Sequence, residues 1–218
     1  MIVTIDGPAG AGKSSVAKRL AEEVGFDFLD TGAMYRCITL ACLLKKVSLE
    51  NALAIAEIAK SARIELHGGT VKLDGKEVSE EIRTPTVTKS IRPIADNTVV
   101  RLTMVALQRD WATGRNVVTE GRDQGTVAFP KAECKLFLTA TAEERAHRRV
   151  RQLIQLGIDA DYQEILDLQN QRDACDIART DGGLKVADDS ITIWTDGLTE
   201  EEVLLTLVKI VQGIQSRG

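Results

Sequence analysis

A glycine-rich segment near the N-terminus has the residue types and the spacing that bind phosphate groups. It reads Gly7-Pro8-Ala9-Gly10-Ala11-Gly12-Lys13-Ser14 and matches the pattern G-x-x-x-x-G-K-[ST] at every fixed position. The glycines allow backbone conformations in which successive N–H groups point at phosphate oxygens. Lys13 can reach the β- and γ-phosphates, and the Ser14 hydroxyl can bind Mg²⁺. We therefore expect ATP to bind to this segment and to Ser15, which follows it.

The elements predicted around this segment are those that its chemistry requires. Residues 2–6 form an apolar run, and apolar residues recur at helical spacing over 13–24. Further strands are expected at 26–29, 116–120, 134–139 and 191–195, and further helices at 31–44, 49–62, 84–113 (interrupted near Pro93), 141–155, 162–177 and 199–214. Short strands that alternate with helices predict an α/β fold with a parallel sheet covered on both faces. Residues 63–78 alternate with Gly-rich turns, which predicts a small antiparallel insert.

The composition excludes several other classes of protein. The chain has 218 residues, enough for one sizeable core, and a net charge of -4, which disfavours a nucleic-acid-binding protein. No apolar run approaches the roughly 18 residues of a membrane span, and we expect no secretory signal. The four cysteines form no C-x-x-C pair, so we expect reduced thiols rather than a zinc site. These features predict a cytoplasmic enzyme.

Arginines gather where an acceptor phosphate would bind. Arg36 follows the strand expected at 26–29, and Arg122 follows the strand at 116–120, so both belong to the sheet edge where α/β proteins bind ligands. Two further sets share helix faces: Arg145, Arg148 and Arg149, and Arg172, Asp176 and Arg179. A GTPase would need N-K-x-D, which the chain lacks. Together with the phosphate loop, these arginines favour a kinase for a small acceptor.

Each of these residues also has a plainer interpretation. Asp30 could cap a helix, and Arg36 could be a surface charge. The arginines near 145 could pair with Glu143 and Glu144, and those near 172 could form an i,i+4 ladder.

Five stretches resemble the bacterial cytidylate kinases. They are Ile5–Ser14, Leu29–Arg36 (LDTGAMYR), Glu120–Pro130 (EGRDQGTVAFP), Leu136–Arg149 (LFLTATAEERAHRR) and Arg172–Arg179 (RDACDIAR). The insert at 63–78 and the Glu81-Ile82-Arg83-Thr84 that follows are also similar to that family. The resemblance implies direct in-line transfer of a phosphate from ATP, with Mg²⁺, to CMP and dCMP. It implies a single kinase domain with a core (1–30, 114–147 and 180–218), an NMP-binding region (31–113) and a helical lid (148–179).

The resemblance also implies roles for individual residues. The acceptor's phosphate would be held by Thr31, Arg36, Arg122 and Arg179, with Asp30 beside them. The cytosine ring would be read by Arg101 and Asp123, and the acceptor's sugar and phosphate would lie near Arg172 and Asp176. The catalytic residues would be Lys13, Arg122, Arg172 and Arg179, and Arg148 and Arg149 of the lid would bind ATP. We expect a monomer that binds neither nucleic acid nor membranes.

The chain departs from the family pattern at Arg92, at Asp173-Ala174-Cys175 and at 181–184. Two alternatives therefore stay open. One is a kinase for another small acceptor such as UMP, and the other is a non-catalytic ATP-binding regulator.

Overall fold

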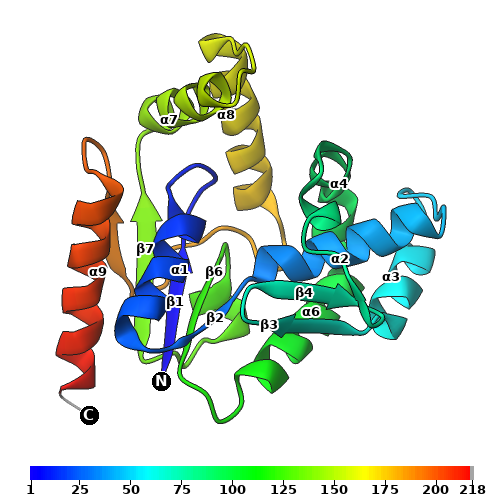
Figure 1. Cartoon of the computed structure of the whole chain (residues 1–218), viewed down its shortest axis with the longest axis horizontal. Helices are drawn as coiled ribbons and strands as arrows, with labels where there is room; N and C mark the ends of the chain where they lie inside the picture. The colour runs from blue at the N-terminus through cyan, green and yellow to red at the C-terminus, as the bar shows by residue number, and fades with distance from the viewer. Residues whose placement is uncertain (217–218) are drawn as a thin grey trace. The chain divides into compact units, whose positions relative to one another are not determined.

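The computed structural model describes residues 1–216 and divides the chain into two compact units. Unit 1 comprises Met1–Phe28 and Gly114–Gly218, and unit 2 comprises Leu29–Thr113. Figure 1 follows the chain through both units from blue to red.

Unit 1 is built on a sheet with the strand order β2-β6-β1-β7-β8 (Figure 1). The strands are β1 (Ile2–Asp6), β2 (Asp27–Leu29), β6 (Val117–Gly121), β7 (Cys134–Thr139) and β8 (Ile191–Trp194). β1 pairs in parallel with β6 and with β7, and β7 pairs in parallel with β8. Asp6 is in register with Gly121 on one side and with Phe137 on the other, so the loops that follow β1, β6 and β7 begin at one edge of the sheet.

Two helices cover one face of this sheet, and a short helical segment lies against the other. The helices α1 (Lys13–Val24) and α9 (Glu200–Gln215) pack together over Val3 and Ile5 of β1, and Leu20 and Leu207 are fully buried there. Side chains alternate along a strand, so Thr4 and Asp6 face the opposite side. There they meet η2 (Gln124–Ala128), a segment of π-helix.

The predicted lid falls within a pair of helices in unit 1. α7 (Ala142–Gln155) and α8 (Tyr162–Ala178) pack against each other, and the rings of His147 and Tyr162 stack with centroids 4.4 Å apart. The lid predicted at 148–179 begins inside α7 and ends one residue after α8. Its borders, like those of the core and the NMP-binding region, stay predictions.

Unit 2 contains the expected antiparallel insert. β3 (Ile64–His67), β4 (Thr70–Leu73) and β5 (Lys76–Glu77) form a three-stranded sheet in sequence order. The helices of this unit are α2 (Thr31–Leu44), α3 (Ala52–Ser61), η1 (Glu81–Arg83), α4 (Pro85–Ser90), α5 (Arg92–Ala95) and α6 (Thr98–Ala112). The α/β class, the parallel sheet and the antiparallel insert are therefore confirmed.

The helical stretch predicted over 84–113, with an interruption near Pro93, is confirmed, and the structure has two breaks there, at 91 and at 96–97, which leave three helices. α4 ends at Ser90, and α5 is a single turn with Pro93 near its start, where a missing N–H is tolerated. The Asn97 side chain then accepts hydrogen bonds from the N–H groups of Val99 and Val100, and this cap begins α6.

The cysteines have the predicted character. All four are free, and Cys37, Cys42 and Cys134 are buried. Burial raises the pKa of the Cys37 and Cys134 thiols to about 12, so neither is a reactive thiolate at neutral pH. Within residues 1–216, no helix has both the length and the apolar character needed to cross a membrane.

The capping box of α9 allows a test of stability. Thr199 Oγ1 accepts from the N–H of Glu202, and the Glu202 carboxylate accepts from the N–H of Thr199. Thr199→Ala should lower the free energy of unfolding by about 1 kcal/mol, because a capping side chain is lost. Urea unfolding followed by circular dichroism measures this. Thr206→Ala, at an exposed position inside the same helix, should change it by less than about 0.5 kcal/mol. Equal losses in the two variants would contradict the role of the cap.

Candidate active site

Three glycines of the phosphate loop have a positive φ, and Gly7 and Gly12 are two of them. Gly7 has φ 148°, and a Cβ there would clash with the carbonyl oxygen of Leu138 on β7. Gly12 has φ 86° and is the N-cap of α1. Both angles belong to the region that favours glycine. The predicted strand–loop–helix arrangement is therefore confirmed, with the N-terminal end of α1 at the loop.

Lys13 is buried inside this loop. Lys13 is 5% exposed, and its Nζ donates a hydrogen bond of 2.7 Å to the carbonyl of Pro8. Burial, followed by the positive charge of Arg122, lowers the pKa of Lys13 to about 7, although Glu120 and Asp6 act in the other direction. The charge of Arg172 also lowers this pKa. A phosphate anion beside Nζ would favour the protonated form again, which the predicted role of Lys13 in binding ATP requires.

Ser14 and Glu120 form the part of the site that suits a cation. Ser14 Oγ donates to Glu120 Oε1 at 3.0 Å, which joins the start of α1 to the end of β6. Ser15 Oγ instead donates to the carbonyl of Gly12. The hydroxyl and carboxylate oxygens are ligands that fit Mg²⁺. Glu120 was absent from the predicted site. Its signal in the sequence is a lone carboxylate at the end of an apolar strand.

One carboxylate gathers two of the predicted acceptor-binding arginines. Asp176 Oδ2 accepts from Arg122 Nε at 2.9 Å, and Asp176 Oδ1 accepts from Arg179 Nη2 at 3.0 Å. Burial would raise the pKa of Asp176, but the charges of Arg122, Arg179 and Arg172 together hold it below its ordinary value. The interpretation of 172–179 as a simple ladder along one helix is incomplete, because Asp176 also binds Arg122, which follows β6. Arg179 itself ends α8 in an extended conformation.

Arg145 of α7 connects the phosphate loop with α8. Its guanidinium donates to the carbonyls of Ala9 (2.9 Å) and Ala140 (3.1 Å) and forms an ion pair of 2.7 Å with Asp173. Gln169 Nε2 donates to the backbone carbonyl of Arg145. Arg145 is thus buried and paired with Asp173, so the plainer interpretation, in which it pairs with Glu143 and Glu144, is wrong for this residue.

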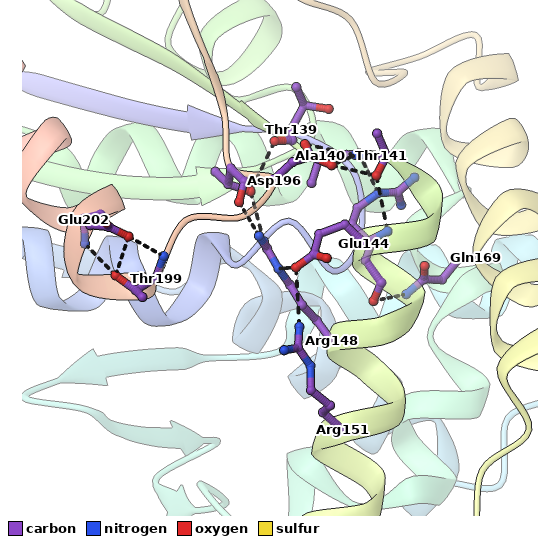
Figure 2. A network of polar contacts seen from close by, with 12 residues as sticks. Thr139, Ala140, Thr141, Glu144, Arg148, Arg151, Gln169, Asp196, Thr199 and Glu202 are labelled. Atoms are coloured by element: carbon purple, nitrogen blue, oxygen red, sulfur yellow. Dashed lines mark hydrogen bonds and ion pairs between the residues drawn. The ribbon is translucent and has the colours of Figure 1, made fainter.

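Arg148 and Arg149, predicted to bind ATP, have different surroundings. Figure 2 shows Arg148 and Arg151 converging on the Glu144 carboxylate, with Arg148 Nε at 2.9 Å. Arg148 also donates to the hydroxyl and the carbonyl of Thr195 after β8. The plainer interpretation, in which these arginines pair with Glu144, is thus confirmed for Arg148. Arg149 is exposed, and its role in ATP binding stays a prediction.

A second polar contact in Figure 2 fixes the start of α7. Asp196 accepts from both the N–H and the hydroxyl of Thr141, and Thr141 in turn caps the helix by accepting from Glu144 N–H. The hydrogen bond from the Thr141 side chain, despite some burial, lowers the pKa of Asp196. This contact ties the loop after β8 to the end of β7.

In unit 2, the residues that begin α2 have structural partners. Asp30 is the N-cap: Oδ1 accepts from Ala33 N–H at 2.8 Å, and Oδ2 accepts from Arg83 at 3.0 Å. The capping interpretation of Asp30 is confirmed. The cap contributes more than the ion pair, since Arg83 is largely exposed and surface pairs are worth at most about 1 kcal/mol. Thr31, the first residue of α2, is buried.

Arg36 and Arg101 are partly or fully buried in the same unit. Arg36 donates to Thr88 Oγ1 (2.7 Å) and to the carbonyl of Ile82, so it is not the free surface charge of the plainer interpretation. Burial, followed by the charge of Arg83, lowers the pKa of Arg36. Arg101 of α6 is 7% exposed and donates to the carbonyl of Ala95. Buried guanidiniums at these places have fixed directions, which a binding residue needs.

The end of β6 leads into a turn that holds two predicted site residues. Asp123, predicted to read the cytosine ring, is buried, and Arg122 precedes it. The next two backbone N–H groups, of Gln124 and Gly125, donate to the carboxylate of Asp6. Asp6 was missed by the sequence analysis, although a carboxylate that ends an apolar strand directly before the phosphate loop was a visible signal.

A buried lysine in a glycine loop, between a parallel strand and a helix, defines the phosphate-binding site of a P-loop nucleotide-binding protein. The comparisons with known proteins specify the class further. The family model described as cytidylate kinase matches residues 3–213, and the chain belongs to the cytidylate kinase family.

Individual relatives agree over nearly the whole chain. The chain is 50% identical to the cytidylate kinase of Rhodopirellula baltica, covering 97% of this chain and 93% of that protein. It is 48% identical to the cytidylate kinase of Caldanaerobacter subterraneus subsp. tengcongensis, covering 93% and 90%. A solved structure of shikimate kinase from Bacteroides thetaiotaomicron matches with a TM-score of 0.50 and 13% identity, covering 97% of this chain and 98% of the other. That likeness shows the fold alone.

The position of Lys13 gives a test of the phosphate loop. Lys13→Ala should fold but lose turnover by about 100-fold or more, because a buried positive charge no longer meets the transferred phosphate. Steady-state ADP release and far-UV circular dichroism measure the two properties. Lys18→Ala changes an exposed lysine on the same helix and should keep turnover within about twofold. Near-normal turnover in Lys13→Ala would contradict a role for Lys13 in phosphate transfer.

Asp176 allows a test of how the arginines are held. Asp176→Ala should lower the free energy of unfolding at pH 7 by about 2 kcal/mol, since two guanidiniums lose a charged acceptor. The pKa of Asp176 is depressed from 3.8, so this stabilisation is present above pH 3.8 and is lost as the pH falls further, through the folded-state pKa. Chemical unfolding at pH 7 and pH 3 checks the trend. Asp167→Ala, exposed on the same helix, is the matched control. A difference between wild type and Asp176→Ala that grows towards pH 3 would disprove the assignment.

Proposed function

We propose that this chain transfers the γ-phosphate of ATP to CMP and dCMP, which gives CDP and dCDP. The observation that supports this best is the match of the cytidylate kinase model from residue 3 to residue 213, which spans the phosphate loop and every predicted acceptor residue. The geometry of the loop and of its buried lysine supports ATP as the donor.

On the donor side, the loop from Gly7 to Ser15 binds the phosphates of ATP through its backbone N–H groups and Lys13. Ser14 and Glu120 would hold Mg²⁺, which, when bound with ATP, neutralises charge on the β- and γ-phosphates. Arg148 and Arg149 are the proposed contacts of the lid with ATP. Arg148 would first have to exchange part of its present bonding to Glu144 and Thr195.

On the acceptor side, each unit contributes its own residues. We propose Thr31, Arg36 and Arg101 in unit 2, with Asp30 as the cap that orients Thr31. In unit 1 the proposed residues are Arg122, Asp123, Arg172, Asp176 and Arg179. A carboxylate at Asp123 suits cytosine because it can accept from the exocyclic amine, which uracil lacks.

The chemistry needs positioning and charge neutralisation rather than a base. The attacking oxygen of CMP belongs to a phosphate and is already anionic, so no residue has to remove a proton from it. Lys13, Arg122, Arg172 and Arg179 stabilise the charge that spreads over the transferred group. The lid at 148–179 excludes water, which would otherwise accept the phosphate. We propose that the enzyme works as a monomer in the cytoplasm.

The test is ADP release from Mg·ATP with CMP, dCMP, UMP and AMP supplied separately. We expect turnover with CMP and dCMP, and at least about tenfold lower kcat/KM with UMP and AMP, because the exocyclic amine of cytosine is one buried polar contact. Fast turnover with UMP would keep the kinase but overturn the cytosine selectivity assigned to Arg101 and Asp123. ATP binding without release of ADP by any acceptor would indicate the non-catalytic regulator.

A further inference from the structure

Asp6 is a buried carboxylate with two backbone partners. The residue is 4% exposed; Oδ1 accepts from Gln124 N–H at 2.8 Å, and Oδ2 accepts from Gly125 N–H at 2.7 Å. Both donors belong to the first residues of η2. These are the first two N–H groups of η2, which have no carbonyl partner within the helix, and the Asp6 carboxylate accepts from both of them.

These two hydrogen bonds complete the anchoring of a short turn. Gly121, the last residue of β6, is held in the ladder opposite Asp6. Gln124 and Gly125 are held by the Asp6 side chain. Only Arg122 and Asp123 lie between the two anchors, so their backbone has little freedom to move.

Burial disfavours the ionised form of the Asp6 carboxylate. Burial raises the pKa of Asp6 to about 6, and the nearby Asp123 raises it as well, whereas the two backbone hydrogen bonds and Lys13 act to lower it. The aliphatic part of Lys135 also approaches, within 3.3 Å of where a Cβ on Gly125 would lie. An ionised carboxylate can accept both hydrogen bonds at once, whereas an asparagine accepts with one oxygen and presents an N–H₂ group to the second donor.

We infer that Asp6 is a positioning residue for the acceptor: its carboxylate sets the place of Arg122 and Asp123. This inference rests on the proposed function, in which those two residues contact CMP. Asp6 also directly precedes Gly7, the first residue of the phosphate loop. The backbone of Asp6 therefore leads into the loop that binds ATP, and its side chain fixes the turn that holds Arg122 and Asp123.

The test is Asp6→Asn, studied by steady-state kinetics with each substrate varied separately. The KM for CMP should rise about tenfold, the effect of one lost charge-assisted hydrogen bond, while the KM for ATP stays within about twofold. A substitution that affects only overall stability would not raise the KM for CMP while leaving the KM for ATP unchanged. Equal rises in both KM values, or no rise for CMP, would overturn the inference.

Thr4→Val is the matched control. Thr4 lies two residues earlier on the same face of β1, and its Oγ1 would be 2.9 Å from a Cβ on Gly125. This hydroxyl is buried and has no hydrogen-bond partner among residues 1–216. Replacing it with a methyl group leaves the Asp6 hydrogen bonds in place, so both KM values should stay within about twofold of wild type.

A second variant covers the case in which Asp6→Asn does not fold. Gly125→Ala keeps the carboxylate, but its Cβ would lie 3.3 Å from Asp6 Oδ2 and 2.9 Å from Thr4 Oγ1, so the turn must shift. It should raise the KM for CMP severalfold and leave the KM for ATP unchanged; an unchanged KM for CMP would reject the inference. Failure of the proposed function is distinct, because wild type itself would then release no ADP with CMP.

Discussion

The hydrogen-bond ladder that places β1 between β6 and β7 is the constraint on which the site depends. Parallel pairing brings Asp6 into register with Gly121 and Phe137, so three loops begin at one sheet edge. The phosphate loop, the turn of Arg122 and the start of α7 all follow from that register. A shift by one residue would exchange the faces of β1, turning Asp6 into the apolar core under α1 and α9 and turning Ile5 towards η2. The approach of Gly7 to the backbone of Leu138 fixes the same register from the side of the loop.

Positive charge is concentrated at this edge, and the structure holds three of its arginines with specific acceptors. Asp176 binds Arg122 and Arg179, while Asp173 and two carbonyls bind Arg145. Burial is the main cause of the lowered pKa of Lys13, and the charges of Arg122 and Arg172 lower it further, so like charges close together add to the free energy of the site. Anionic substrates relieve that repulsion, so the property that destabilises the site also favours binding of phosphates.

Helices α7 and α8 form hydrogen bonds with the loops at the edge of the sheet. α7 touches the phosphate loop through Arg145 and the loop after β8 through Arg148. α8 reaches the turn after β6 through Asp176. In unit 2, the Asp30 cap and the contacts of Arg36 with the segment 82–88 fix the start of α2 by local hydrogen bonds.

The sequence by itself determined the α/β class, the phosphate loop and the antiparallel insert, because each is a local pattern of residue types. It also placed Arg122 directly after the strand that the structure shows as β6. Tertiary structure alone decided their partners: that Arg145 is buried against Ala9, that Asp176 joins two arginines 57 positions apart, 122 and 179, and that Asp6 holds a turn 118 positions away. The physical reason is that such contacts depend on which strands are neighbours. Pairing between distant strands is set by the packing of the whole sheet, which no local spacing reports.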